Sequence, residues 1–452
     1  MLTQEVDLAV APAELLQGWA GEPHSFLLDG GGLRSWGDGV ARFGARPVAT
    51  LAVFGDGRGL LRQGERPPEE QRGQPFVLLD RFRARYSPTR QRGFSGVVVV
   101  ALSYDLSRLL ERLAVRRRPS AEDLVLFAAA YPWMLSYSYA AQRYRLMIAT
   151  GAEAQAEPLR AELCRRAARP RLMHRRPVQP PQPELDQAHH IDAVRQALRH
   201  IKAGDIYQVN LAQRFHSANA PPPNAAFTEL QRMHPMPYGA YFDLGATTLV
   251  CNSPECLIEL EGRTVATYPI KGTRRRDLDD GLDRELVAEL RRDPKECAEH
   301  VMIVDLERND LGRVCRPGTI QVDRLMEVES FGSLHHLVSR ISGQLEPQVD
   351  LAEVLRAMFP GGSITGAPKI RATEIIDELE PCERGFYTGA IGYICGERAV
   401  FNIAIRTAIV RDRQLWYYAG GGIVADSDPM REYQETLLKA QPFLSLLAAS
   451  PA

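Results

Sequence analysis

The chain has 452 residues, of which 45% are hydrophobic and 25% are charged, and its formal net charge is -1. This composition is that of a folded globular protein, and the near-zero charge argues against a general role on nucleic acid or on a membrane surface, because both usually require a basic field. The 7 cysteines include no Cys-x-x-Cys pair, which fits neither a zinc ribbon nor a disulfide framework. We therefore expect free thiols and a cytoplasmic location.

The first part of the chain, to about residue 167, alternates short apolar runs with glycine and proline and is predicted to consist mainly of strands. A stretch with five prolines, Pro170–Pro183, follows and predicts an extended linker. These features divide the chain into a strand region at 1-167 that packs on the catalytic core, a proline-rich linker at 168-187 and a catalytic domain at 188-448. The expected strands of the first region are Ser25–Leu28, Val48–Phe54, Phe76–Leu79, Val97–Ser103 and Leu146–Thr150.

The chain after the linker opens with an amphipathic helix, in which Ile191, Val194 and Leu198 recur at helical spacing before a stop at Gly204. A strand at Ile206–Phe215 follows. Strands and helices then alternate to the C-terminus, a pattern typical of a layered α/β or α+β domain built on a large sheet.

Lys271 stands out chemically because it ends the strand pattern Val265–Ile270, which forms an expected hairpin with Leu257–Leu260, and because three arginines soon follow it. A lysine acts as a nucleophile or base at neutral pH only when its ammonium form is disfavoured, for example by burial beside other cations. The residues alone favour the alternative, a solvated side chain at a strand end, since most lysines are exposed.

Two predicted helices each begin at an Asp-Pro pair and carry two glutamates three residues apart, which places each pair on one face. If the helices face each other, four carboxylates would suit Mg2+, which takes oxygen ligands and keeps several waters. The alternatives are a capping box for the first glutamate and ordinary solvated side chains. The residues are Asp293, Pro294, Glu296 and Glu299 on one helix, and Asp428, Pro429, Glu432 and Glu435 on the other.

A glycine-rich stretch, Pro360–Lys369, leads directly into a predicted helix, whose free backbone N–H groups can bind an anion. It is not a phosphate-binding P-loop, because Ala367 stands where that loop needs lysine, so a carboxylate is the expected ligand. A second glycine run, Gly420–Gly422, follows the strand Leu415–Ala419. It predicts either a tight turn or a close approach of backbone amides to a ligand.

Arg406 lies in an alternating strand pattern, Phe401–Thr407, and would be buried in a central strand. A buried arginine needs an anionic partner, which is either a substrate carboxylate or an internal Asp or Glu. His336 is one of two adjacent histidines, and the residues alone favour a hydrogen-bonded structural histidine over a catalytic one.

Taken in order, these segments resemble the motifs of chorismate-utilising enzymes, strongly from Ala188 to Leu447 and more loosely before that. The resemblance implies that family's fold, an α/β (α+β) large layered domain in which antiparallel β-sheets are sandwiched and flanked by helices. The motifs are Ser253-Pro254-Glu255, Pro269 to Thr273, Glu299-His300 with Val304 to Asp310, His336 to Ser339, Gly362 to Lys369, Ile405-Arg406-Thr407, Ala419 to Val424 and Glu432 to Thr436.

Two positions separate the chemistries within the family. Isochorismate synthases have a lysine base where this chain has Gln208, and anthranilate synthases share the glutamine but typically have alanine where this chain has Lys271. The combination of Gln208 with Lys271 resembles the branch that aminates chorismate at C4 with ammonia, giving 4-amino-4-deoxychorismate on the route to 4-aminobenzoate and folate. The alternatives are amination at C2, as in anthranilate synthase component I, and a protein that binds chorismate without turning it over.

The resemblance also implies a role for each candidate residue. Lys271 would attack C2 of chorismate and form a covalent intermediate, while Glu255 would protonate the departing C4 hydroxyl. The implied cofactor is Mg2+, held by Glu299 and Glu435 with Glu296 and Glu432 supporting it through water. The chorismate ring and carboxylates would contact Gln208, Thr273, His336, Thr365, Gly366, Tyr393, Arg406, Gly421, Gly422 and Lys439.

The implied partners are chorismate, ammonia and a separate glutamine amidotransferase subunit, because the chain lacks the Gly-x-Cys-x-Gly sequence of an amidotransferase nucleophile. No nucleic acid or membrane partner is expected. The charge balance argues against the first, and the longest obvious apolar run, Val97–Leu102, is too short to span a bilayer.

Overall fold

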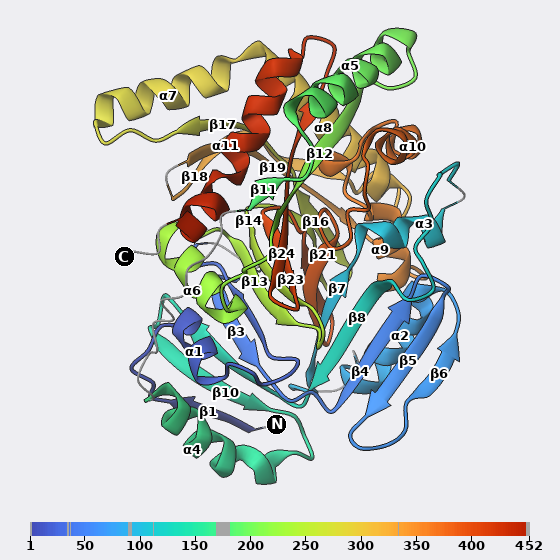
Figure 1. Ribbon diagram of the computed structural model, residues 1–452. Helices are drawn as coiled ribbons and strands as arrows, with labels where there is room; N and C mark the ends of the chain where they lie inside the picture. The colour runs from blue at the N-terminus through green and yellow to red at the C-terminus, as the bar shows by residue number, and fades with distance from the viewer. Residues whose placement is uncertain are drawn as a thin grey trace.

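The computed structural model describes residues 2–33, 36, 38–88, 93–111, 113–168, 181–332 and 334–448. Within these residues, two antiparallel sheets of twelve strands each lie face to face, and helices cover their outer surfaces (Figure 1). The expected fold class is confirmed: the protein is an α/β (α+β) layered domain with antiparallel sheets flanked by helices.

The first sheet contains residues from both ends of the chain, and its short strand β20 (Gly366–Ala367) pairs with β12. Its other strands, in spatial order, are β1 (Leu2–Val6), β10 (Arg143–Ile148), β9 (Trp133–Ser138), β3 (Val40–Gly44), β2 (Phe26–Asp29), β13 (Tyr238–Asp243), β14 (Thr248–Ser253), β23 (Thr407–Arg411), β24 (Gln414–Ile423), β12 (Gln208–Ser217) and β11 (Gln182–Pro183).

The second sheet has the same mixed origin, and its strand β18 (Gln321–Phe331) pairs with β19. Its other strands, in spatial order, are β17 (Ile270–Arg275), β19 (Leu334–Gln344), β16 (Thr264–Tyr268), β15 (Cys256–Glu261), β22 (Arg398–Asn402), β21 (Ala390–Cys395), β7 (Val97–Leu102), β8 (Leu124–Tyr131), β4 (Ala49–Phe54), β5 (Arg58–Gln63) and β6 (Glu69–Arg72).

Three apolar cores hold the layers together. One lies between the two sheets, a second joins the first sheet to its helices, and a third joins the second sheet to its helices. The helices on the first sheet are α1 (Pro12–Gly18), α4 (Ala156–Ala167), α6 (Pro223–Met233) and α11 (Pro429–Ala448), and those on the second are α2 (Pro75–Tyr86), α8 (Pro294–Gly312) and α9 (Leu351–Met358). The remaining α-helices are α3 (Ser107–Leu110), α5 (Gln187–Ala203), α7 (Asp280–Arg292) and α10 (Lys369–Leu379), of which α5 and α10 pack on β12.

The N-terminal region contributes strands to both sheets rather than a layer of its own. β2 pairs with β13, and β7 pairs with β21. Strands before and after the proline-rich stretch therefore share one pair of sheets. Most of the expected linker, residues 169–180, lies outside the described residues, so the domain boundary remains a prediction.

One strand expectation for the N-terminal region is wrong. Phe76–Leu79 lies in helix α2, which starts at Pro75. Four apolar residues in a row fit either a buried strand or a helix. Pro75 at the first helical position and burial that continues at Phe82 favour the helix, because these positions give helical spacing.

Of the two alternatives for the Gly420–Gly422 run, the tight turn is excluded, because the run lies inside β24. A Cβ on Gly420 would lie 2.6 Å from the Leu211 carbonyl oxygen of the neighbouring strand. Glycine thus allows β12 and β24 to approach closely at this point.

The predicted thiol state and the helix starts are confirmed. All seven cysteines are free, Asp293 caps α8, and Asp428 Oδ1 accepts hydrogen bonds from the first turn of α11.

Among the described helices, none is both long and apolar enough to cross a membrane.

Candidate active site

The elements that carry the candidate residues gather in the upper half of the molecule in Figure 1, where α8 and α11 lie near β12, β17 and β19. Residues 271 and 299 meet there: Lys271 Nζ lies 2.6 Å from Glu299 Oε1, and each side chain is only 13% exposed. Gly272 follows with a φ of 64°, at an irregularity in the β17–β19 pairing that favours glycine. The structure therefore does not show Lys271 as a solvated side chain.

The arginines after Lys271 pair with acids and do not crowd its amine. Arg274 lies 2.7 Å from Asp293 and 3.7 Å from Glu296, and Arg276 lies 3.5 Å from Asp283. The arginines therefore do not provide the cationic surroundings that would disfavour the ammonium form of Lys271. The charged group in direct contact with Lys271 is the Glu299 carboxylate.

Three of the four glutamates lie against the glycines of β24, and the fourth, Glu296, lies beside Gly272. A Cβ on Gly422 would lie 2.9 Å from Glu299 Oε1, and one on Gly421 would lie 3.2 Å from Glu432 Oε2 and 3.7 Å from Glu435 Oε1. Two adjacent backbone positions thus lie between the Glu299 carboxylate of α8 and the two carboxylates of α11. Side chains at these glycines would fill the space between the two helices.

The carboxylates differ in charge environment. Burial, followed by the nearby Glu299 charge, raises the pKa of Glu296, and burial also raises the pKa of Glu432. Burial alone would raise the pKa of Glu435, but the Lys439 ammonium at 2.7 Å, together with the charges of Lys295 and Lys271, outweighs it and the pKa is lowered. The site thus contains carboxylates already neutralised by lysines and others that hold their protons more tightly.

The four glutamates fit a divalent cation by their chemistry, since all are hard oxygen donors of the kind that Mg2+ binds. Among the described residues, no three acidic, His or Cys side chains stand close enough together to hold an ion as arranged. Two of the four carboxylates have lysine partners instead, Glu299 with Lys271 and Glu435 with Lys439. A bound cation would have to compete with these ammonium groups.

Glu255 is a further buried acid of the group. It lies between β14 and β15, where its backbone N–H donates to Ser253 Oγ at 3.1 Å. Burial raises the pKa of Glu255 to about 7, against the opposing effects of Ser363 and of the Lys271 charge. A carboxyl that is half protonated near neutral pH is suited to act as a general acid.

Several buried polar atoms in this group have no hydrogen-bond partner among the described residues. They are both amide atoms of Gln208, Glu255 Oε1 and His336 Nε2. Buried polar groups are normally satisfied, so unpaired atoms at neighbouring positions indicate a place for a polar ligand. Burial, reinforced by the Arg406 charge, lowers the pKa of His336 to about 3, which leaves its imidazole neutral. Its Nδ1 lies 3.1 Å from Thr273 Oγ1.

Arg406 lies between β22 and β23 with a φ of 49°, and not inside one continuous strand as expected. Its guanidinium contacts Met236 Sδ at 3.5 Å, and in the described part of the chain no acidic side chain pairs with it. The internal Asp or Glu considered from the sequence is thus not found there. A substrate carboxylate remains the candidate partner.

The loop before α10 contacts β12 next to Gln208 and borders the group of candidate residues there. The Thr365 carbonyl accepts from Asn210 N–H at 2.8 Å, and Gly366 pairs with Val209 in β12. Gly366 has a φ of 142°, and a Cβ there would collide with the Gln208 carbonyl. Glycine is therefore required for the loop to reach β12.

Tyr393 is the one predicted substrate residue that the structure places elsewhere. It is buried between the two sheets, its hydroxyl donates to the Trp36 carbonyl at 3.2 Å, and Arg42 stacks on its ring. Its position in β21 directs it toward the N-terminal strands. A strand pattern alone does not tell which face of the strand a tyrosine occupies, and this assignment is corrected.

Glu307 and Thr267 form a buried contact that the sequence patterns did not single out. The Thr267 hydroxyl donates to Glu307 Oε2 at 2.8 Å. The available signal was the spacing on α8, where Glu307 shares the buried side with Ile303 and Leu311. A carboxyl in such an apolar stripe requires a polar partner.

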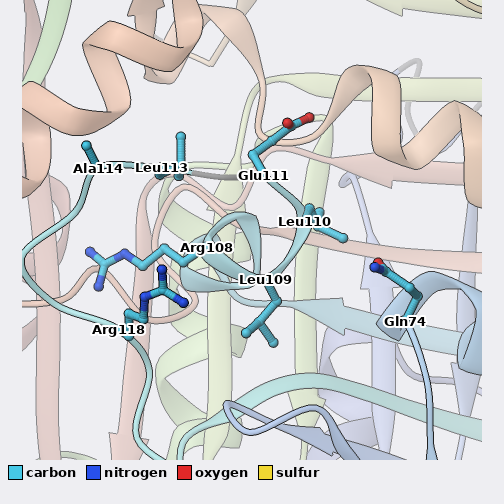
Figure 2. A pocket seen from close by; sticks show the side chains of 8 residues that line it. All are labelled: Gln74, Arg108, Leu109, Leu110, Glu111, Leu113, Ala114 and Arg118. Atoms are coloured by element: carbon cyan, nitrogen blue, oxygen red, sulfur yellow. The ribbon is translucent and has the colours of Figure 1, made fainter.

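A cavity of about 790 Å³ lies elsewhere in the molecule and contains none of the candidate residues (Figure 2). It is formed by α3, the loop after it and the start of α2. Its arginine Arg108 is already paired with Asp105 and Asp377. The cavity thus offers neither a nucleophile nor an unpaired buried acid, and the group around Lys271 remains the candidate active site.

Comparisons with known proteins agree with this geometry. The family model described as chorismate binding enzyme matches residues 27–445. The chain is 40% identical over 412 residues to anthranilate synthase component 1 of Streptomyces coelicolor, covering 85% of this chain and 80% of the relative. It is 37% identical over 409 residues to aminodeoxychorismate synthase component 1 of Klebsiella aerogenes, covering 89% of each.

Among solved structures, anthranilate synthase component I from Streptococcus pneumoniae superposes with a TM-score of 0.76 at 27% identity, covering 90% of this chain and 92% of that one. The family match extends over most of the chain and includes every candidate residue. The chain belongs to the family of chorismate binding enzymes.

Proposed function

We propose that this chain aminates chorismate at C4 with ammonia and gives 4-amino-4-deoxychorismate, as an aminodeoxychorismate synthase component I. The observation that supports this most is the position of Lys271, whose amine lies inside the glutamate group and not in bulk solvent. The branch that resembles this chain uses a lysine at this position as its nucleophile, where anthranilate synthases typically have alanine.

The proposed reaction starts with the Lys271 amine. Its nitrogen forms a bond to C2, the ring electrons shift, and the C4–O bond breaks while Glu255 donates its proton, so that water leaves. Ammonia then adds at C4, the electrons shift back, and the lysine leaves C2 as a neutral amine. The new C4 ammonium returns one proton to Glu255. The net reaction consumes chorismate and ammonia and releases the aminated product and water.

Electrostatics support these roles. Chorismate carries two carboxylates, and Arg406 offers a guanidinium without an acidic partner among the described residues. Glu255 has its pKa raised to about 7 by burial, so it carries a proton in part of the molecules at neutral pH. Lys271 is ion-paired to Glu299, so its ammonium must leave that contact and give a proton to solvent before the neutral amine can attack C2.

The proposed cofactor is Mg2+, held by Glu299 and Glu435 with Glu296 and Glu432 in support. When bound, it would supply positive charge to these carboxylates and to a carboxylate of the substrate. Other residues of the chain bind and orient the substrate. Gln208, Thr273 and His336 orient the ring, and Thr365, Gly366 and the backbone of Gly421 and Gly422 line the position of the substrate.

A separate glutamine amidotransferase is the proposed source of ammonia. The relatives are named component 1, which indicates a second component in those proteins. With this chain alone, ammonium should support turnover and glutamine should not.

The test is to incubate the protein with chorismate, Mg2+ and ammonium and to identify the product by chromatography and mass spectrometry. The expected product is 4-amino-4-deoxychorismate. Amination at C2 is the second candidate, favoured by the 40% identity to an anthranilate synthase component 1. Anthranilate as the main product would reject the C4 assignment, and the absence of any turnover would favour a chorismate-binding protein without activity.

A further inference from the structure

Strand β12 carries a second carboxamide on the same face as Gln208. Side chains of a strand alternate between two faces, so Gln208 and Asn210 share one face. Val209 and Leu211 share the other face, where they pack with α5 and α10 in one apolar core. The Asn210 side chain therefore lies on the side of β12 that these two helices do not cover.

The pairing of β12 with β24 shows what this side of the strand contains. Asn210 pairs directly with Gly422, and side chains of a direct pair start about 4.5–5.5 Å apart on the same face. A Cβ on Gly422 would lie 2.5 Å from Gln208 Nε2 and 2.9 Å from Glu299 Oε1. Asn210 thus lies next to the Gln208 amide, on the side of β24 that faces Glu299.

The backbone groups of Asn210 are both hydrogen-bonded. Its N–H donates to the Thr365 carbonyl at 2.8 Å, and its carbonyl accepts from Arg384 Nη2 at 2.8 Å. Arg384 is only 1% exposed and is held in turn by Glu380, whose Oε1 lies 2.6 Å from the same nitrogen. The position of Asn210 in the strand is therefore fixed without any contribution from its side chain.

The side chain of Asn210, in contrast, lacks a partner. The residue is 9% exposed, and its buried Oδ1 accepts no hydrogen bond in the described part of the chain. The next residue on this face, Ala212, packs in an apolar cluster with Tyr387 and Tyr418. Asparagine is disfavoured inside strands, and a buried polar atom without a partner costs stability. An apolar side chain would suit the protein alone better, so the amide is explained by a ligand that completes its hydrogen bonding.

We propose that Asn210 is a further substrate-binding residue, whose carboxamide forms a hydrogen bond with bound chorismate beside Gln208. This role rests on the proposed function, in which chorismate is the substrate. A carboxamide both donates and accepts hydrogen bonds, so it can pair with a carboxylate, an ether oxygen or a hydroxyl. It carries no charge and transfers no proton, so Asn210 contributes to binding and orientation and not to bond formation.

Thermal unfolding of the full chain with and without chorismate, in the presence of Mg2+, tests this role without requiring turnover. Chorismate is expected to raise the melting temperature of the wild type, because a ligand that binds only the folded state stabilises it. Asn210→Leu keeps the volume of the side chain and removes an unpaired polar atom, so the melting temperature without chorismate should not fall. The chorismate dissociation constant should rise about tenfold, and the upward shift at a given concentration should shrink accordingly.

Gln213→Leu is the matched control. Gln213 is another buried carboxamide of β12, but it lies on the opposite face, where its Nε2 donates to Thr436 Oγ1. This variant should lower the melting temperature and keep the full shift with chorismate. Asn210→Ala removes the amide without adding bulk, and it should weaken chorismate binding as Asn210→Leu does, which excludes a steric effect of the leucine.

A lower melting temperature in Asn210→Leu with an unchanged chorismate dissociation constant would mean that Asn210 is structural and would overturn the proposal. A wild type that chorismate does not stabilise would reject the proposed substrate together with this contact. Weaker chorismate binding in Asn210→Leu together with a C2 product would support the contact and reject only the C4 assignment.

Steady-state rates separate the two substrates. Asn210→Leu should raise KM for chorismate about tenfold and leave KM for ammonium unchanged. A rise in KM for ammonium alone would overturn the contact with chorismate.

Discussion

Helix α8 carries two carboxylates that each pair with a lysine from another element. The two pairs look alike, but only one of them belongs to the candidate active site. Lys271 pairs with Glu299 at 2.6 Å, and Lys369 pairs with Asp310 at 2.5 Å, eleven residues further along α8. All four side chains are largely buried, so neither distance nor burial separates the two pairs.

The difference lies in what surrounds each lysine. Near Lys271 stand buried polar atoms without partners among the described residues, on Gln208, Glu255 and His336. Lys369 is the first residue of α10 and attaches that helix to α8 through Asp310. The comparison shows that an ion pair identifies a reactive lysine only together with neighbouring groups that a ligand could satisfy.

The largest expected difference between the pairs comes from changing each lysine to arginine. Arginine keeps the positive charge and can pair with the same carboxylate, but it does not act as an amine nucleophile. Lys271→Arg should therefore abolish formation of the aminated product, and Lys369→Arg should retain turnover. The measurement is product formation with ammonium, together with mass spectrometry of the intact protein for a chorismate-derived adduct in the wild type. Equal turnover in the two variants would remove the distinction between the pairs.

The next effect concerns the acid beside Lys271. Glu255→Gln keeps the size of the side chain but cannot donate a proton, so kcat should fall by about 10²–10⁴-fold. In the wild type, activity should decline as pH rises through about 7, where Glu255 loses its proton. The pH profile of kcat checks this, and a profile that stays flat from pH 6 to pH 8 would argue against Glu255 as the acid.

The same residue makes a separate prediction for stability. The folded-state pKa of Glu255 is raised, so the folded protein binds more protons than the unfolded chain between the ordinary glutamate pKa and about 7. Its contribution to stability is present at low pH and is lost as pH rises through about 7. Urea unfolding at pH 5.5 and pH 8 should show a smaller difference in Glu255→Gln than in the wild type.

A smaller effect is expected at Arg406, which would contact a substrate carboxylate without taking part in bond formation. Removing a charged hydrogen bond costs about 1.5–3 kcal/mol, which corresponds to roughly ten- to hundredfold in KM. Arg406→Met should raise KM for chorismate with little change in kcat, and Arg406→Lys should have a weaker effect because the planar fork is lost but the charge is kept. An unchanged KM in Arg406→Met would exclude this contact.

The features that the sequence predicted correctly are mostly local. The Asp-Pro helix starts, the β15–β16 hairpin and the glutamate spacing on α8 depend on residues a few positions apart. The layered antiparallel fold was implied by the resemblance and is confirmed. The helix at Phe76–Leu79 was missed because a short apolar run fits either a strand or a helix, and Pro75 at the helix start favours the helix.

The features that could not be predicted depend on contacts between distant segments. The partner of Lys271 is Glu299, 28 positions away on another element, whereas the arginines that follow Lys271 turn to other acids. Tyr393 points to Trp36, because the pairing of β21 with its neighbours fixes the face on which its side chain lies. Sequence spacing thus identified candidate side chains for the site. Which of these side chains are in contact was determined by the packing of distant segments.

The smallest expected effect on turnover, and the sharpest test of the comparison, is at Lys369. Lys369→Met leaves the Asp310 carboxyl buried without its cation, and breaking a buried pair in this way costs about 3–5 kcal/mol of stability. Burial already raises the pKa of Asp310 in the presence of the lysine, so the carboxyl should take up a proton in the variant. The double variant Lys369→Met with Asp310→Asn should recover part of the loss, since no unpaired charge remains.

Urea unfolding measures both effects, and kcat per folded molecule should stay close to the wild-type value. A large fall in kcat without loss of stability would place Lys369 in the reaction and make the two pairs equivalent.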